Sequence, residues 1–298
     1  MKYTFSYSNP HKHFVDIEFI IDHIATESIE IQLPAWRPGR YELGNFAKNI
    51  QQWKAYGTDN SVLKFKKLTK DKWLVQTNGN SEITIKYNYY SNELNAGSTF
   101  LDQSQLYVNP VNCCLYIEDR QLEPCEVKLD IPSNYKVATG LEKIGEHHFN
   151  AKDFHTLVDS PFIASASIHH HLFNTKGIQF HVWMQGLCNP DWNRIETDFL
   201  KYTNLQIEVF GEFPVDVYHY LFQILPHKGY HGVEHQNSTT VSIGPGKDLM
   251  TKKLYDEVLG VSSHELFHTW NVKAIRPIEM QPYNYAKENH SPLGYVAE

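Results

Sequence analysis

Most of the first 165 residues fall into short segments in which apolar and polar side chains alternate. Two examples are "KHFVDIEFIID" and "SEITIKYNYYS", which are rich in Val, Ile, Tyr and Phe. Alternation with a period of two places successive side chains on opposite faces of a β-strand. Gly, Asn, Pro and Asp occupy the connections, as in "YGTDNS" and "TNGNS". We therefore predict that residues 1–165 form an all-β, sandwich-like N-terminal domain.

The pattern changes in residues 166–298, which we expect to form a second domain. "DWNRIETDFLKYTNLQIEVFG", residues 191–211, has apolar residues at helical spacing and ends on a glycine that can stop a helix. Strands are predicted at 215–225 and 238–244, with a loop between them. A long helix follows, with Leu254, Val258 and Val261 along one side. Together the two parts predict the α+β class.

Charge and hydropathy exclude two kinds of partner. The formal net charge is −7 at pH 7, whereas a surface for nucleic acid requires a basic face. No run of 18 apolar residues occurs, so no membrane-spanning segment is expected. The first residues, "MKYTFSYSNPHKHF", lack the apolar core of a signal peptide, which favours a cytoplasmic protein. The sequence does not fix the oligomeric state.

The four cysteines favour the same compartment, because they include no C-x-x-C pair and no metal-binding spacing. We expect reduced, partly buried thiols at Cys113, Cys114, Cys125 and Cys188. A bridge from Cys113 or Cys114 to Cys125 is the alternative.

The stretch "SSHELFHTWNVKAIRP" carries the strongest chemical signal of the chain. His264 and His268 are four residues apart, so a helix presents both imidazoles on one face, one turn apart. Two such nitrogens can bind one Zn²⁺ at roughly 2.0–2.1 Å each. Glu265 leans toward the same side and can act as general base and then general acid for a water molecule that zinc activates. The pattern predicts a metallopeptidase site.

A third ligand is needed, and Glu279, Glu288 and Glu298 have suitable spacing. "NHSPLGYVAE" predicts a new helix, with Ser291 as N-cap and Pro292 in its first turn. A carboxylate on that helix could face the histidines, which favours Glu298. Glu288 lies in the polar stretch "YAKENH" and is expected to face solvent.

"HELFHTWNVKAIRP" followed by "LGYVAE" closely resembles the M61 family of metallopeptidases, the glycyl aminopeptidase family. The resemblance extends to "LPAWRPGRYELGNFAKNI", "LVDSP" and "GVEHQNST", and so covers nearly the whole chain. It implies a β-rich domain followed by a thermolysin-like catalytic domain, as in the larger M1 aminopeptidases. It also implies that the Glu of "VAE", Glu298, is the third zinc ligand. Family members continue beyond this point, so the resemblance implies that the catalytic domain is truncated after Glu298.

The segment "GVEH" gains a meaning from the same resemblance, because M1 enzymes bind the substrate's free α-amine with a Glu in a similar segment. Glu234 stands at the corresponding position, with Gly232 and His235 beside it, and His235 replaces the Asn of the M1 pattern. A carboxylate near the metal would anchor an ammonium group and direct cleavage to peptide N-termini. The alternative is that Glu234 is an ordinary loop carboxylate.

These predictions define a zinc aminopeptidase with one Zn²⁺ per chain, acting on peptides with small N-terminal residues such as Gly or Ala. The rival is a noncatalytic zinc-containing module that binds a peptide or protein partner. Glu265 favours catalysis, because a structural zinc site has four protein ligands and needs no free carboxylate beside them. The segment "WRPGRYELGNF" is predicted as a turn at Pro38-Gly39 against the sheet, with a substrate-facing loop as the alternative.

Overall fold

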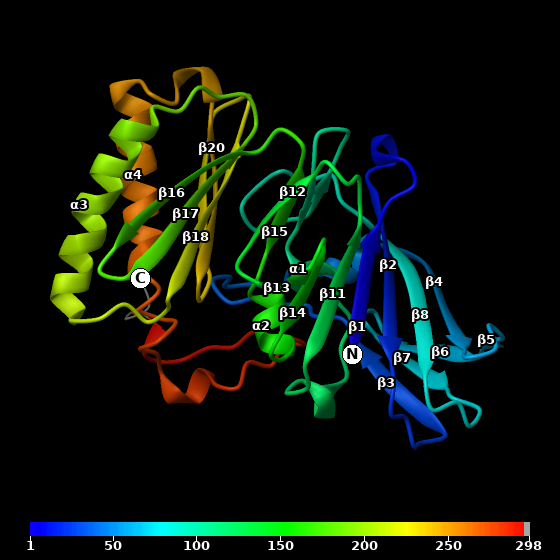
Figure 1. Cartoon of the computed structure of the whole chain (residues 1–298). Coiled ribbons are helices and arrows are strands. Elements are labelled where there is room, and N and C mark those ends of the chain that lie inside the picture. The colour runs from blue at the N-terminus through cyan, green and yellow to red at the C-terminus, as the bar shows by residue number, and fades with distance from the viewer. Residues whose placement is uncertain (295–298) are drawn as a thin grey trace.

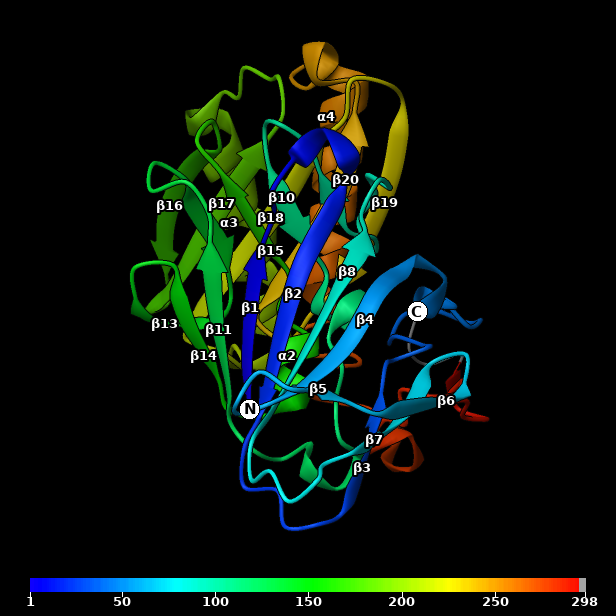
Figure 2. The ribbon, with the colours of Figure 1, turned by 90° about the vertical axis from the view of Figure 1, so that its right-hand side faces the viewer.

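The computed structural model describes residues 1–294, and its largest element is a twisted eight-stranded sheet in the N-terminal part (Figures 1 and 2). All neighbouring strands are antiparallel except β1 and β11, which are parallel. In spatial order the strands are β13 (Glu142–Gly145), β14 (His148–Ala151), β11 (Cys125–Asp130), β1 (Lys2–Ser6), β2 (Phe14–Ile21), β8 (Ile83–Tyr90), β4 (Ile50–Gly57) and β5 (Val62–Leu63). The alternation seen in the sequence produces this arrangement, because every second side chain of β2 is buried.

Two smaller sheets complete the N-terminal part. One contains β3 (Ser28–Gln32), β7 (Lys72–Gln76) and β6 (Phe65–Thr69). The other contains β12 (Lys136–Thr139), β15 (Phe162–Ser165), β10 (Leu106–Val108) and β9 (Phe100–Leu101). The short helices here are α1 (Pro110–Cys113), α2 (Phe154–Val158), and the 3-10 helices η1 (Pro10–Lys12), η2 (Phe46–Asn49) and η3 (Glu118–Arg120).

The second part is a five-stranded sheet with two long helices on one face (Figure 1). Its strands, in order, are β16 (His169–Thr175), β17 (Ile178–Gln185), β18 (Val217–Ile224), β20 (Ser238–Gly244) and β19 (Gly229–Glu234). The helices are α3 (Trp192–Phe210) and α4 (Lys252–Phe267), and η4 (Gly246–Asp248) and η5 (Ile278–Met280) lie in the connections. The predicted α+β class is confirmed.

Opposite faces of the five-stranded sheet bury different partners. Tyr218, Tyr220 and Phe222 of β18 pack with the two long helices. Leu221, which points the other way, packs with side chains of the four-stranded sheet. A hydrogen bond from Gln223 Nε2 to Gln105 Oε1, 2.8 Å long, crosses the same contact. The four-stranded sheet therefore joins the two parts of the molecule.

The sequence predicted α3 closely. Asp191 caps its start by accepting a hydrogen bond from the Arg194 N–H, and Gly211 ends it with a φ of 85°. The loop predicted at 226–237 was wrong, because half of it is the edge strand β19, paired antiparallel with β20. Two glycines and one histidine among the six residues of β19 obscure the alternation there.

The segment predicted as a final helix is described only as far as Gly294. Ser291 Oγ accepts a hydrogen bond from the Leu293 N–H at 3.0 Å, as an N-cap does. The Leu293 side chain in this segment is 44% exposed. Glu298, the predicted third ligand, lies outside the described residues.

The four cysteines are free thiols, and Cys113, Cys114 and Cys125 are buried. Burial raises the pKa of the Cys125 thiol to about 12, which keeps it unreactive. Among residues 1–294, no helix is both long and apolar enough to cross a membrane.

Candidate functional site

Helix α4 brings two imidazoles together at its C-terminal end. Its buried residues Leu254, Val258 and Val261 pack against the five-stranded sheet and fix which way the helix faces. His264 and His268 then turn toward each other, and their Nε2 atoms are 3.0 Å apart. His268 Nδ1 lies 2.9 Å from the carbonyl oxygen of Asn271. A carbonyl can only accept, so Nδ1 carries the proton and Nε2 of His268 presents its lone pair.

This arrangement fits a divalent metal ion. The two Nε2 atoms converge, and a backbone carbonyl orients His268 in the way usual for metal-ligating histidines. In the described part of the chain, no group of three His, Cys, Asp or Glu side chains could hold a metal. Glu279 accepts a hydrogen bond from Ser291 Oγ, and Glu288 accepts one from the Leu43 N–H. Neither of these candidates joins the histidines.

Glu265 is buried beside the histidine pair, with 5% of its surface exposed. The edge strand β19 runs close to it at Gly232, where an added β-carbon would lie 2.0 Å from Glu265 Oε1. Only glycine allows the strand backbone to come this near to the carboxylate. Gly232, singled out from the sequence as a substrate-binding residue, therefore lies directly against the predicted general base.

Glu234 is the last residue of β19 and lies against the loop 36–41 of the N-terminal part. A β-carbon on Gly39, which has a φ of 72°, would be 2.8 Å from Glu234 Oε2. The loop is held by hydrogen bonds from the Ala35 and Trp36 N–H groups to the Tyr285 carbonyl. Because Gly39 lies against the Glu234 carboxylate, the loop 36–41 faces Glu234 as well as the sheet.

One pocket of about 170 Å³ connects these elements. Its wall includes side chains of the loop 36–41, Glu234, His268, and residues between 272 and 294. The predicted metal ligand His268 and the predicted amine anchor Glu234 thus share one pocket. The pocket is built from both parts of the molecule.

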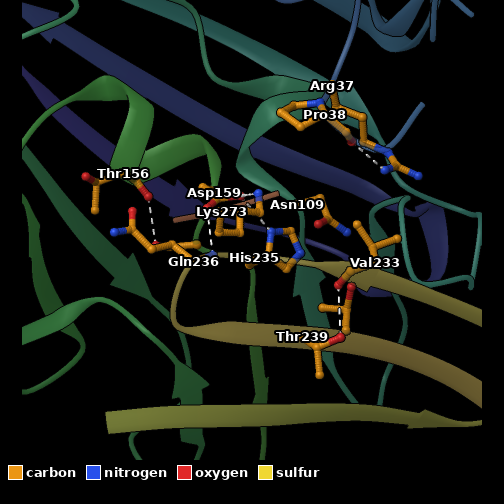
Figure 3. A network of polar contacts seen from close by, with 12 residues as sticks. Arg37, Pro38, Asn109, Thr156, Asp159, Val233, His235, Gln236, Thr239 and Lys273 are labelled. Carbon is orange, nitrogen blue, oxygen red and sulfur yellow. Dashed lines mark hydrogen bonds and ion pairs between the residues drawn. The ribbon is translucent and has the colours of Figure 1, made fainter. Parts of the chain in front are cut away.

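His235 is buried next to this pocket and is not part of its wall. Its Nδ1 atom lies 3.1 Å from Asp159 Oδ1. The same carboxylate accepts hydrogen bonds from Lys273 Nζ and the Gln236 N–H, each 2.9 Å long (Figure 3). These contacts join the segment after α2, the turn after β19 and the loop after α4.

Charges in this network stabilise one another. Burial raises the pKa of the Asp159 carboxyl group, but Lys273 and His235 outweigh burial and hold that pKa well below its usual value. Burial lowers the pKa of Lys273, but Asp159 and Glu234 more than compensate, so it lies above its usual value. Asp159 and Lys273 therefore form a permanent ion pair at neutral pH.

Arg37 is a second buried cation at the site, with 7% of its surface exposed. Burial lowers the pKa of Arg37, and the negative charge of Glu234 opposes that effect. Its Nη1 group donates a hydrogen bond to the Pro38 carbonyl at 3.0 Å. Two buried cations, Arg37 and Lys273, thus lie within the electrostatic reach of Glu234.

Sequence reasoning did not assign a role to Arg37, Asp159 or Lys273. Arg37 and Asp159 lie in "WRPGRY" and "LVDSP", two of the segments that carry the family resemblance, and this was the available signal. Lys273 is paired with Asp159, because the chain after His268 folds back toward the N-terminal part.

Comparison with known families matches both ends of the chain. The family model described as the peptidase M61 N-terminal domain matches residues 2–166, and the model of the M61 glycyl aminopeptidase matches residues 257–298. Among curated proteins, no sequence matches this chain.

Solved structures share the fold. A crystal structure of an aminopeptidase N family protein from Idiomarina loihiensis is 29% identical, with a TM-score of 0.91. That match covers 99% of this chain and 52% of the other, so the chain spans about half the length of that relative. A variant M1 zinc metallopeptidase from Deinococcus radiodurans is 12% identical, with a TM-score of 0.51, over 91% of this chain and 63% of its own. The same enzyme bound to a Tyr-Ser-Ala substrate is 13% identical, with a TM-score of 0.52 and the same coverage of both chains. At 12–13% identity, the similarity to these M1 enzymes shows that they share the fold of this chain.

Proposed function

Because this chain belongs to the M61 peptidase family, we propose that it is the N-terminal portion of a zinc-dependent peptidase that trims amino acids from peptide N-termini. One observation carries the proposal. The Nε2 atoms of His264 and His268 converge to 3.0 Å, and His268 is oriented by a backbone carbonyl so that its Nε2 lone pair is available.

In this proposal His264, His268 and Glu298 hold one Zn²⁺ ion. Elimination supports Glu298, because Glu279 and Glu288 have other partners within residues 1–294. When bound, zinc supplies Lewis-acid activation of water, whose pKa falls to about 7 in such sites. Three protein ligands leave one coordination position for the reacting groups.

Glu265 is the general base and then the general acid. Its carboxylate accepts a proton from the attacking water and later delivers it to the leaving amine. Its burial against Gly232 restricts its carboxylate to a narrow range of positions, which favours proton transfer in a fixed geometry.

Glu234 binds the α-ammonium group of the substrate through its charge and hydrogen bonds. Its position in the pocket shared with His268 supports this role. The pocket is small, since about 170 Å³ is below the roughly 300–1,000 Å³ of typical ligand sites. Small N-terminal residues such as Gly and Ala therefore suit it, in agreement with the glycyl aminopeptidase model that matches the chain.

Metal content and hydrolysis of Ala-p-nitroanilide by the full-length protein test the proposal. We expect one zinc per chain, and we expect Glu265→Gln to reduce kcat at least 1,000-fold, roughly the upper range for loss of general acid–base catalysis. Asp256→Asn is the matched control, because Asp256 lies on the same helix, faces solvent and forms only a surface ion pair with Lys252.

Bound zinc without hydrolysis of this or longer peptides would favour the noncatalytic binding module. A folded full-length protein that binds no zinc would exclude both the zinc peptidase and the zinc-containing binding module.

A further inference from the structure

Asp159 lies outside the pocket but contacts two of the segments that form it. It comes from the connection between α2 and β15, and its side chain is 23% exposed. His235 and Gln236, which bind it, directly follow the predicted amine anchor Glu234. Lys273, which also binds it, is only 5% exposed and follows His268 by five residues.

Two buried cations, Arg37 and Lys273, both feel the carboxylate of Glu234. The Asp159 carboxylate, 2.9 Å from Lys273 Nζ, neutralises one of them. Without Asp159, Lys273 would carry an unpaired positive charge near Glu234, which repels an ammonium ion.

We propose that Asp159 is a positioning residue for amine recognition, which binds Lys273 and so leaves the negative charge of Glu234 available to the substrate's α-ammonium group. This inference rests on the proposed role of Glu234. The hydrogen bonds of Asp159 to His235 and Gln236 fix the chain next to Glu234, while its ion pair keeps Lys273 from neutralising Glu234.

Peptide binding without hydrolysis tests this proposal. The full-length protein with Glu265→Gln is titrated calorimetrically with Ala-Ala-Ala and with propionyl-Ala-Ala, which lacks only the amine. We expect Asp159→Asn to weaken binding of Ala-Ala-Ala about tenfold, because one added charge near a binding site changes affinity by about that factor. Binding of propionyl-Ala-Ala should change less than twofold.

A second variant separates charge from packing. Asp159→Asn combined with Lys273→Met removes both members of the ion pair, and it should restore Ala-Ala-Ala binding to within about threefold of the parent, since the unpaired cation at position 273 is removed as well. Glu82→Gln, which removes an exposed carboxylate of the N-terminal part, is the control for a general change in charge.

Equal weakening for both peptides would overturn the proposal, as would a double variant that binds Ala-Ala-Ala no better than Asp159→Asn. Glu234→Gln separates a failure of the proposed Glu234 role from a failure of the Asp159 role alone. If Glu234→Gln leaves Ala-Ala-Ala binding unchanged, the role of Glu234 fails and this inference fails with it. If Glu234→Gln weakens binding but Asp159→Asn does not, this inference alone fails.

Discussion

At position 232 there is room for a hydrogen atom and nothing larger. A β-carbon there would lie 2.0 Å from Oε1 of Glu265 and 2.6 Å from its Cδ. Because Glu265 is buried, its carboxylate can avoid such a contact only by leaving its present position. The precision of the predicted general base therefore depends on a residue in another element.

We predict that Gly232→Ala lowers kcat about 100-fold, because misplacing a reacting group by about 1 Å has that effect. Zinc content should stay at the wild-type level, since the substitution does not touch the histidines. Hydrolysis of Ala-p-nitroanilide and metal analysis of the full-length protein measure the two effects. An unchanged kcat would show that the carboxylate has another productive position.

At the residue scale, the sequence predicted those site residues whose spacing in the chain follows a local pattern. Spacing alone indicated His264, Glu265 and His268, because four residues make about one helical turn. Asp159 and Lys273 are 114 residues apart, and no local pattern predicts that they meet. The pairing depends on how the two parts of the molecule pack.

At the scale of elements, the sequence predicted the two long helices but not the edge strand β19. Helices α3 and α4 carry apolar side chains at regular spacing over 19 and 16 residues. Strand β19 has six residues, and its structure depends on the hydrogen bonds that it makes with β20. Pairing of this kind is a tertiary property, so a short segment with two glycines resembled a loop.

Helix α4 contains an exposed glycine, Gly260, one turn before His264. A β-carbon at this position meets no atom within 4 Å. We predict that Gly260→Ala raises the free energy of unfolding by about 0.5–1 kcal/mol, because alanine loses less backbone entropy in a helix. Thermal unfolding followed by calorimetry measures this change, and a lower midpoint would contradict it. The same variant, with kcat unchanged, is the matched control for Gly232→Ala.

At the scale of the whole molecule, Asp159 links the two parts through a charge that depends on pH. The folded protein holds its pKa below that of an unfolded aspartate, which is about 3.9. A lowered folded pKa stabilises the protein above the unfolded value, and this stabilisation is lost as pH falls toward the folded value. Acid should therefore weaken the connection between the two parts.

We predict that Asp159→Asn lowers the free energy of unfolding by about 3 kcal/mol at pH 7, because it leaves Lys273 buried without its partner. The difference between wild type and variant should begin to shrink below about pH 5, because the unfolded wild type then starts to bind a proton at Asp159 that the folded protein does not bind. Denaturant titrations at several pH values measure this. A difference that stays constant down to pH 3 would contradict an electrostatic origin.

The wall of the pocket combines the loop 36–41 with the strand that ends at Glu234, nearly 200 positions later in the chain. Neither segment can change its side chains here independently of the other, because Gly39 lies directly against the Glu234 carboxylate. Among homologues we expect the two segments to covary, and a chimera that joins halves of distant relatives should inherit a mismatched pocket. In the proposed peptidase, substrate preference therefore depends on both segments together, and replacing one of them alone should not transfer it.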